Sequence, residues 1–317
     1  IAGAGSGVSG GSVAVYTGFG SSTSSGDFFI RTVNAGNNGV SGALVFASGS
    51  TSKGTSGSIS LETGRATAGK GGNVAVSIGS GDSGNGGVVS VTAGETTASN
   101  MAGGSITLTA GLASSATGGR GGHLTMDGGM GSGMSGGSVH FAAGFGSSTS
   151  SGNVDFYTPD AGNNGVSGFL LFQTGSTSEG TSGSVSFETG ASTHGKAGAF
   201  DVVVGSGNSG DGGAIVVTAG ETTAKDQAGG SISMTAGLAS NANGGRGGDV
   251  SVSAGAGSGV SGGSVWLSTG FGSSTSSGDI SIDTWNAGNN GVSGAITFRS
   301  GTTSAGTSGK ISVDTGR

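Results

Sequence analysis

The chain has 317 residues, of which 77 are glycine, one is proline and none is cysteine, and its formal net charge is −6 at pH 7. The lack of cysteine excludes a disulfide framework and a thiolate metal site, and the scarcity of proline without a Gly-X-Y period excludes collagen. A charged fraction of 9% gives no basic surface for nucleic acid, and no apolar run approaches the ~18 residues of a membrane span.

The sequence repeats at two levels, and the longer level has a period of 126 residues. The string GFGSSTSSG begins at Gly18, Gly144 and Gly270, and other shared strings keep the same offset without insertions. We expect one continuous body over residues 1–317. Because both ends fall inside a repeat, we also expect the sequence to be a window of a longer chain. The long repeats cover approximately 1–126, 127–252 and, in part, 253–317.

Each long repeat divides into eight short repeats of 15–18 residues, twenty in all. Each short repeat has a glycine, an apolar residue two positions later, a second apolar residue after another two, and a small or β-branched residue after two more. We call the two apolar residues the apolar pair and the residues around them the alternating segment. Strict alternation predicts a strand with one buried face.

The apolar pairs are the predicted core of the molecule. In chain order they include Val13 with Val15, Leu44 with Phe46, Ile59 with Leu61, Ile106 with Leu108, Leu170 with Phe172, Ile232 with Met234 and Ile296 with Phe298. The glycines that precede the pairs indicate backbone positions with positive φ or with close approach of another chain segment. These turn glycines include Gly11, Gly26, Gly42, Gly57, Gly104 and Gly137.

The spacing of the strands selects the fold class. A strand every 15–18 residues is too closely spaced for βαβ units and more widely spaced than the strands of a hairpin sandwich. We therefore predict an all-β fold, a parallel β-solenoid or β-helix of about twenty coils with eight coils per long repeat, in which stacked apolar pairs form the core. The 16-residue short repeats carry Val33, Pro159 or Trp285 in place of a glycine, so a distinct turn is expected there.

The residues that could carry chemistry do not form a recurring site. His123, His140 and His194 have no histidine at the equivalent positions of the other long repeats, which favours a surface role. Glu62 and Glu188 recur 126 residues apart, too far for the carboxylate pair of a glycosidase, so surface charge or a local ion pair is the preferred interpretation. We expect no catalytic, cofactor-binding or metal-binding residue and no enzyme activity.

Two binding functions concern the loops and the outward strand positions. The string SGDSGNGG from Ser80 favours an ordinary Asx turn over a calcium turn, because other short repeats lack the aspartate. Thr107 and Thr109 form a Thr-x-Thr pair of the kind found on ice-binding surfaces, but the same columns elsewhere carry charged and aromatic residues.

Some outward strand positions are apolar, which is typical of a contact surface. We expect these residues to pack against a neighbouring molecule or another segment of the same chain. They are Phe29, Val45, Leu171, Val203, Val216 and Trp266.

The pattern GxSGGSVxVxTG from Gly7 and the string GTSGSISLETG from Gly54 resemble the very large Gly/Ser/Thr-rich repeat proteins of stramenopile algae such as diatoms. The chain also resembles, more loosely, filamentous β-helix adhesins of bacteria. The resemblance implies an extracellular, fibrous or surface-coating role and transfers no catalytic residue.

We therefore expect a structural protein that forms a rigid extracellular rod or filament, secreted or at the cell surface. Its expected partner is itself, either as separate copies or as further repeats of one chain, with no nucleic acid, membrane span or cofactor. The alternative is an adhesive module that binds a glycan, mineral or ice surface.

Overall fold

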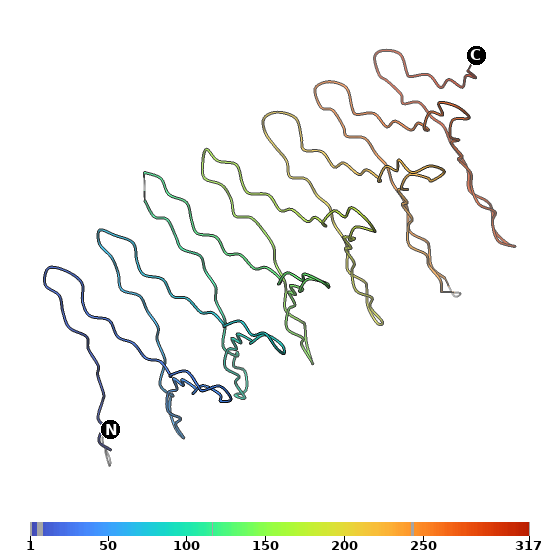
Figure 1. Cartoon of the computed structure of the whole chain (residues 1–317). Helices are drawn as coiled ribbons and strands as arrows, with labels where there is room; N and C mark the ends of the chain where they lie inside the picture. Colours follow the sequence, from blue (N-terminus) through green and yellow to red (C-terminus); the bar gives the residue numbers. More distant parts are fainter. Residues whose placement is uncertain (1, 5–8, 116, 242–243, 317) are drawn as a thin grey trace. The chain divides into compact units, whose positions relative to one another are not determined.

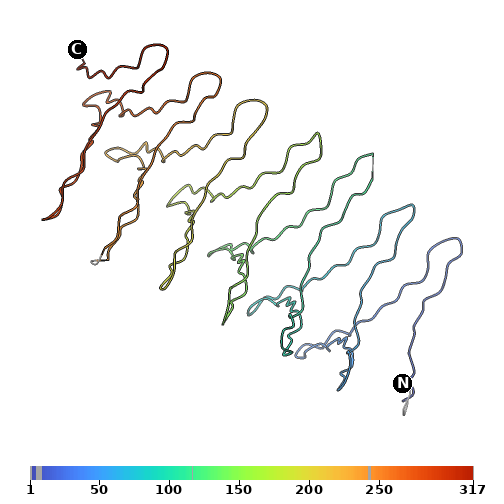
Figure 2. The ribbon, with the colours of Figure 1, turned by 180° about the vertical axis from the view of Figure 1, so that it is seen from behind.

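The computed structural model describes residues 2–4, 9–115, 117–241 and 244–316. The chain divides into two units, Ile1–Tyr157 and Thr158–Arg317, and the boundary lies inside the second long repeat. In each unit the backbone traces a succession of open loops (Figures 1 and 2).

No helix and no strand occurs in the described residues, where only turns and bends interrupt an otherwise extended backbone. The prediction of an all-β parallel solenoid is therefore wrong. Fourteen backbone N–H groups of the described residues donate to backbone carbonyls, whereas a folded protein of this length has about 200 such bonds. None of the fourteen joins equivalent positions of neighbouring short repeats, so the hydrogen-bond ladder that would define a sheet is missing.

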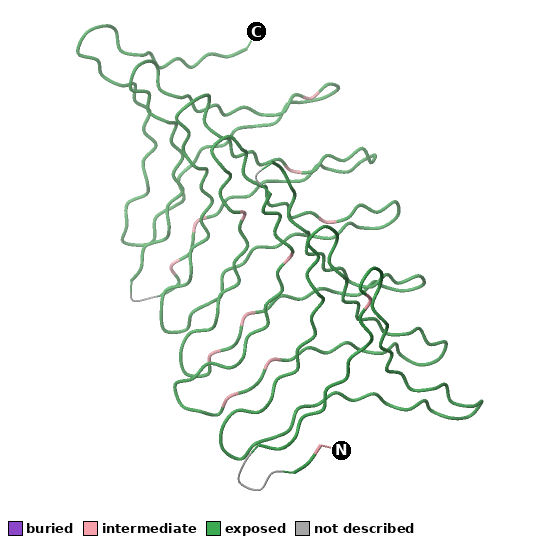
Figure 3. Ribbon diagram, turned by 90° about the vertical axis from the view of Figure 1, so that its left-hand side faces the viewer, coloured by how far each residue is buried: buried purple, intermediate pink, exposed green. Residues whose placement is uncertain are grey.

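The predicted core is also not formed, because no residue in the described ranges is buried (Figure 3). Without a ladder, no second layer covers the apolar side of the alternating segments. The exposed fraction of the predicted core residues runs from 48% at Ile296 to 82% at Leu61. The affected residues are Val13, Val15, Leu44, Phe46, Ile59, Leu61, Ile106, Leu108, Leu170, Phe172, Ile232, Met234, Ile296 and Phe298.

The chain approaches itself most closely at the base of each loop, and we call this contact the neck. The glycine two residues before each apolar pair lies against the residue that ends the previous alternating segment. A Cβ added to Gly42, for example, would lie 3.4 Å from the Cγ2 of Thr32. Of the thirteen half-buried residues in the described ranges, eight are the small residues of necks, among them Ala93, Ala110 and Ala219. The necks are thus the most protected part of the molecule.

Many necks are closed by a backbone hydrogen bond between two glycines. The N–H of Gly26 donates to the carbonyl of Gly18 at 3.0 Å, and the N–H of Gly104 donates to that of Gly94 at 2.8 Å. None of the predicted turn glycines, all of which the structure describes, has a positive φ. An added Cβ would be crowded, at 3.0–3.3 Å from its nearest neighbour, at Gly11, Gly57, Gly104 and Gly137, and would make an ordinary contact at Gly26 and Gly42.

The 16-residue short repeats form a turn of their own, and its bonds recur between long repeats. Gly39 donates to Gly36, and the equivalent bonds join Gly165 to Gly162 and Gly291 to Gly288. In two of these necks the closing hydrogen bond comes from a threonine hydroxyl instead of a glycine N–H. Oγ1 of Thr158 donates to the carbonyl of Gly168 at 3.2 Å, and Oγ1 of Thr284 donates to the carbonyl of Gly294 at the same distance.

Positive φ angles occur instead at the loop tips, again in register with the long repeat. Gly54, Gly180 and Gly306 occupy equivalent positions and have φ of 108°, 109° and 136°. Asn100 and Asp226 are equivalent and share a φ of 61°, a conformation that Asn and Asp tolerate better than most residues. The 126-residue period is therefore expressed in the backbone of the loops.

Candidate functional site

The apolar pairs are the most extensive chemical feature that the chain presents. Every described short repeat carries its pair with both side chains exposed, from 47% at Val139 to 92% at Val313. The first residue of a pair is generally the less exposed of the two, as in Ile59 and Leu61 at 57% and 82%. Each pair is thus an apolar surface that no other described part of the chain covers.

Phenylalanine side chains at apolar-pair positions contact one another across neighbouring short repeats in the second long repeat. In the first unit, the rings of Phe141 and Phe156 lie edge to face with centroids 6.0 Å apart. In the second unit, Phe187 lies 6.0 Å from Phe172 in the same geometry and 6.0 Å from Phe200 with the planes 28° apart. We call these five residues the phenylalanine row. Aromatic pairs at this distance attract one another, so neighbouring pairs form local apolar clusters.

The six outward apolar residues are exposed as well. Their exposed fractions run from 67% at Leu171 to 91% at Trp266, and the other four are Phe29, Val45, Val203 and Val216. Since the apolar pairs are also exposed, each of the six alternating segments that carry one of these residues offers apolar atoms to solvent on both of its sides.

The recurring acidic residues are held by hydroxyl groups two positions away. Oγ of Ser60 donates to Oε1 of Glu62 at 2.9 Å, and Ser186 donates to Glu188 at 3.0 Å. The corresponding bond from Ser312 to Asp314 is 2.8 Å long. The three carboxylates therefore accept hydrogen bonds within their own segments.

Arg246 forms an ion pair with Asp249. The arginine recurs at the equivalent position of the other long repeat, whereas the aspartate does not. Nη2 of Arg246 lies 2.8 Å from Oδ1 and 2.9 Å from Oδ2 of Asp249. The equivalent of Asp249 in the first long repeat is His123. Both partners are largely exposed, so the contact contributes little stability.

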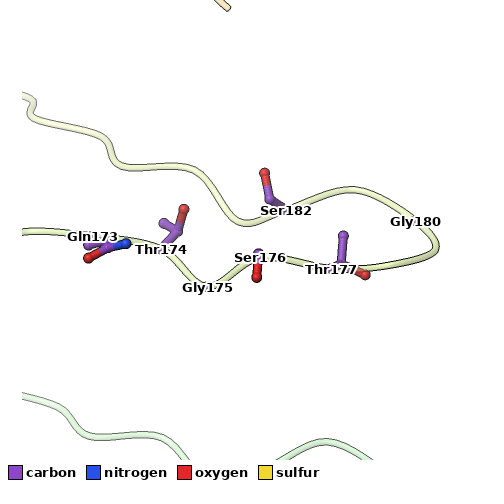
Figure 4. A pocket seen from close by; sticks show the side chains of 7 residues that line it. All are labelled: Gln173, Thr174, Gly175, Ser176, Thr177, Gly180 and Ser182. Carbon is purple, nitrogen blue, oxygen red and sulfur yellow. The ribbon is translucent and has the colours of Figure 1, made fainter. Parts of the chain in front are cut away.

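The groups that could support catalysis are scattered. Among the described residues, no three His, Asp or Glu side chains come together in a way that could hold a metal ion. His194 contacts the hydroxyl of Thr193 at 3.1 Å. A hollow of about 820 Å³ is an open space beside one loop of the second unit (Figure 4). Its lining, all of it described, carries hydroxyl and amide groups but no ionisable side chain: Gln173, Thr174, Gly175, Ser176, Thr177, Gly180 and Ser182.

In the described ranges no helix has the length and apolar character needed to cross a bilayer. No protein-family model matches the sequence, and no similar curated protein or solved structure was found.

Two features of the site were not inferred from the sequence. The first is the neck contact: the glycine and the small residue were each recognised as regular, but not as partners. In the sequence, the glycine and the small residue flank every loop, and this regularity could have indicated that they are in contact. The second is the phenylalanine row, whose signal is the spacing of Phe141, Phe156, Phe172 and Phe187 at one short repeat each.

Proposed function

We propose that this chain is a structural protein that builds an extracellular fibre or coat by associating with further copies of itself. The supporting observation is the exposed apolar pair that recurs in every short repeat. The accessible surface is 31036 Å² for a chain of 29.2 kDa. A compact protein of this mass exposes about 11,500 Å², and its extended chain about 42,000 Å².

A chain with this much exposed surface needs a partner to become stably ordered. Fixing the backbone of one residue costs about 1–2 kcal/mol, and burial of apolar side chains is the main contribution that offsets this cost. No apolar side chain in the described ranges is buried within the chain itself. Association supplies the missing burial, at about 1.5–3 kcal/mol for each large apolar side chain that becomes fully covered.

The composition suits such an assembly. A net charge of −6 over 317 residues gives weak repulsion between copies, and the absence of cysteine removes thiol oxidation outside the cell. The proposal assigns no catalytic step to the chain. It places the contacts at the apolar pairs and at the six outward apolar residues.

The proposal is tested by following assembly with light scattering, sedimentation velocity and electron microscopy. The variant carries Leu171→Asp and Val216→Asp, which place charges on two exposed apolar positions of the second unit. Burying these carboxylates is unfavourable, so the concentration needed for assembly should rise by about ten- to a hundredfold. The matched control carries Ser176→Asp and Ser206→Asp, which add the same charge in loops and should assemble like the parent chain.

Three outcomes separate the possibilities. Long filaments from the parent chain and the control, but not from the variant, support the proposal. Equal assembly of all three chains would reject the role of the outward apolar residues. A parent chain that remains monomeric but binds silica, ice or glycan particles would favour the adhesive alternative.

A further inference from the structure

Five asparagines of this chain are followed directly by glycine, and this dipeptide undergoes a spontaneous reaction in water. The backbone nitrogen of the glycine attacks the side-chain amide carbon, Cγ, of the asparagine and expels ammonia, which leaves a five-membered succinimide ring. Glycine favours the reaction because it has no side chain to hinder the approach of its nitrogen. The five residues are Asn38, Asn85, Asn164, Asn243 and Asn290, of which Asn243 lies outside the described residues.

Three of the four described asparagines share one kind of turn, in which the attacking nitrogen is already engaged. The N–H of Gly39 donates to the carbonyl of Gly36 at 3.2 Å. The equivalent bonds of Gly165 and Gly291 are 3.0 and 3.1 Å long. An added Cβ at Gly39 would also lie 3.4 Å from the Cβ of Ala35, so the glycine is in a closed turn. The nitrogen must give up its hydrogen bond before it attacks, which slows the reaction in these turns.

Asn85 lies in a loop in which the attacking nitrogen is not engaged. In the part of the chain that the structure describes, the N–H of Gly86 has no hydrogen-bond acceptor, and an added Cβ at this glycine would meet no atom within 4 Å. Asn85 is exposed, and its side-chain amide makes no hydrogen bond with any described residue. Neither reacting group of this dipeptide therefore has to break a contact before the ring forms.

The second long repeat shows that this loop accommodates the acidic product. Asp211 occupies the position equivalent to Asn85 and is likewise followed by glycine. The two loops share their backbone conformation, with a φ of 75° at Gly84 and of 74° at the equivalent Gly210. The bend also covers equivalent positions in both loops. An aspartate in place of Asn85 is therefore compatible with the folded loop.

We propose that Asn85 is a site of spontaneous succinimide formation, which converts it to aspartate and isoaspartate faster than the asparagines of the hydrogen-bonded turns. In the first step a bond forms between the nitrogen of Gly86 and Cγ of Asn85, the bond from Cγ to the amide nitrogen breaks, and the proton of the Gly86 N–H leaves with the amide as ammonia. Water then opens the ring. Cleavage between Cγ and the ring nitrogen gives aspartate, whereas cleavage between the backbone carbonyl carbon and that nitrogen gives isoaspartate.

The conversion changes the charge of the loop in both products and the length of its main chain in one of them. The new carboxylate joins that of Asp82, and the formal net charge of the chain goes from −6 to −7. In isoaspartate the main chain passes through Cγ and is one carbon longer. This inference does not rest on the proposed function, because it depends only on the conformation of single loops.

The test compares these asparagines within one chain. The full chain is incubated at mildly alkaline pH in isotope-labelled water, digested with trypsin in ordinary water, and analysed by mass spectrometry, in which each converted residue carries a labelled oxygen. Asn38 lies in the tryptic peptide 32–53 and Asn85 in the peptide 71–120, and each peptide contains one Asn-Gly pair. The same incubation in concentrated denaturant gives the rate of each residue without the folded loop, which corrects for their different neighbours in the sequence.

We expect Asn85 to react in native buffer at nearly its rate in denaturant and to give both products. Asn38, Asn164 and Asn290 should react about two- to tenfold more slowly in native buffer than in denaturant, because one hydrogen bond must break before the attack. An Asn85 that is slowed by folding as much as Asn38, or that yields no isoaspartate, would overturn the proposal.

Two substitutions separate the role of the glycine from that of the loop. Gly86→Ala adds a Cβ where the loop has open space, so the fold is kept, but the Cβ hinders the attacking nitrogen and should slow the conversion of Asn85 severalfold. The matched control Gly81→Ala, whose Cβ would come no closer than 3.9 Å to a described atom, should leave the rate unchanged. Asp211→Asn introduces an amide into the equivalent loop and should give a residue that reacts as fast as Asn85. An unchanged rate in Gly86→Ala, or an introduced amide that reacts as slowly as Asn38, would contradict the proposal.

Discussion

Gly104 shows how the close approach of two backbones restricts the size of a side chain at a neck. Its N–H donates to the carbonyl of Gly94 at 2.8 Å, and an added Cβ would lie 3.0 Å from the nitrogen of Gly94 and 3.3 Å from the Cβ of Ala93. The constraint is close approach of two backbones, and any larger residue would require the backbone of Gly94 to shift by a few tenths of an ångström. The sequence marked this position as regular but could not distinguish close approach from positive φ, since both require glycine.

We expect Gly104→Ala to open this neck. The added Cβ displaces the backbone of Gly94, and the closing hydrogen bond lengthens or breaks. Loss of a bond worth about 0.5–1.5 kcal/mol should speed hydrogen exchange of the residue 104 amide about two- to tenfold relative to its intrinsic rate. The control is Gly94→Ala, because a Cβ at that glycine meets no described atom within 4 Å. Equal exchange in the two variants would contradict the steric explanation.

At the scale of the loop, the order of loops along the chain was predicted from the sequence more accurately than the fold was. The positions of the loops, their glycine ends and the distinct turn of the 16-residue short repeats follow from local rules, and such rules are visible in one chain. The distinct turn is confirmed by the bond from Gly165 to Gly162 and its two equivalents. The prediction of strands was wrong because a sheet requires hydrogen bonds between neighbouring segments. Alternation of apolar and polar residues determines which side of a segment is apolar, but it does not determine which segment lies beside it.

Thr158 allows one of these loops to be tested without disturbing its backbone. Its hydroxyl donates to the carbonyl of Gly168 at 3.2 Å and closes the neck where Pro159 has replaced the usual glycine. Thr158→Val should loosen the loop, so that the amide of Gly165, bonded to Gly162, exchanges about two- to tenfold faster. Thr174→Val is the matched control, since the hydroxyl of Thr174 makes no hydrogen bond to any described residue in the next neck. Unchanged exchange in Thr158→Val would show that the threonine acts only as a spacer.

At the scale of the whole molecule, the candidate surface was partly predictable. The apolar pairs and the six outward apolar residues could be identified from the period. Whether another layer of the same chain covers them could not be predicted from the sequence. Burial is a property of distant segments, and repeats of nearly equal sequence give every segment many equivalent neighbours. Under the proposed function, association between chains is the route by which the uncovered pairs gain apolar burial.

Net charge should control that association. The chain carries −6 at pH 7 and has a pI near 4.8, so repulsion between copies is smallest near pH 4.8. The rate of assembly, followed by light scattering, should therefore be highest near pH 4.8 and lower at pH 7.

The rate of assembly below the pI provides the control for this explanation. When the 17 Asp and Glu residues are protonated, the 11 Lys and Arg and the three His remain positive, so the net charge exceeds in magnitude that at pH 7. Assembly should then be slower at about pH 2.5 than at pH 7. In 1 M salt, where screening acts within about 3 Å, the three rates should converge. A rate that keeps rising below pH 4.8 would mean that protonated carboxyl groups, rather than the loss of net charge, promote the contact between copies.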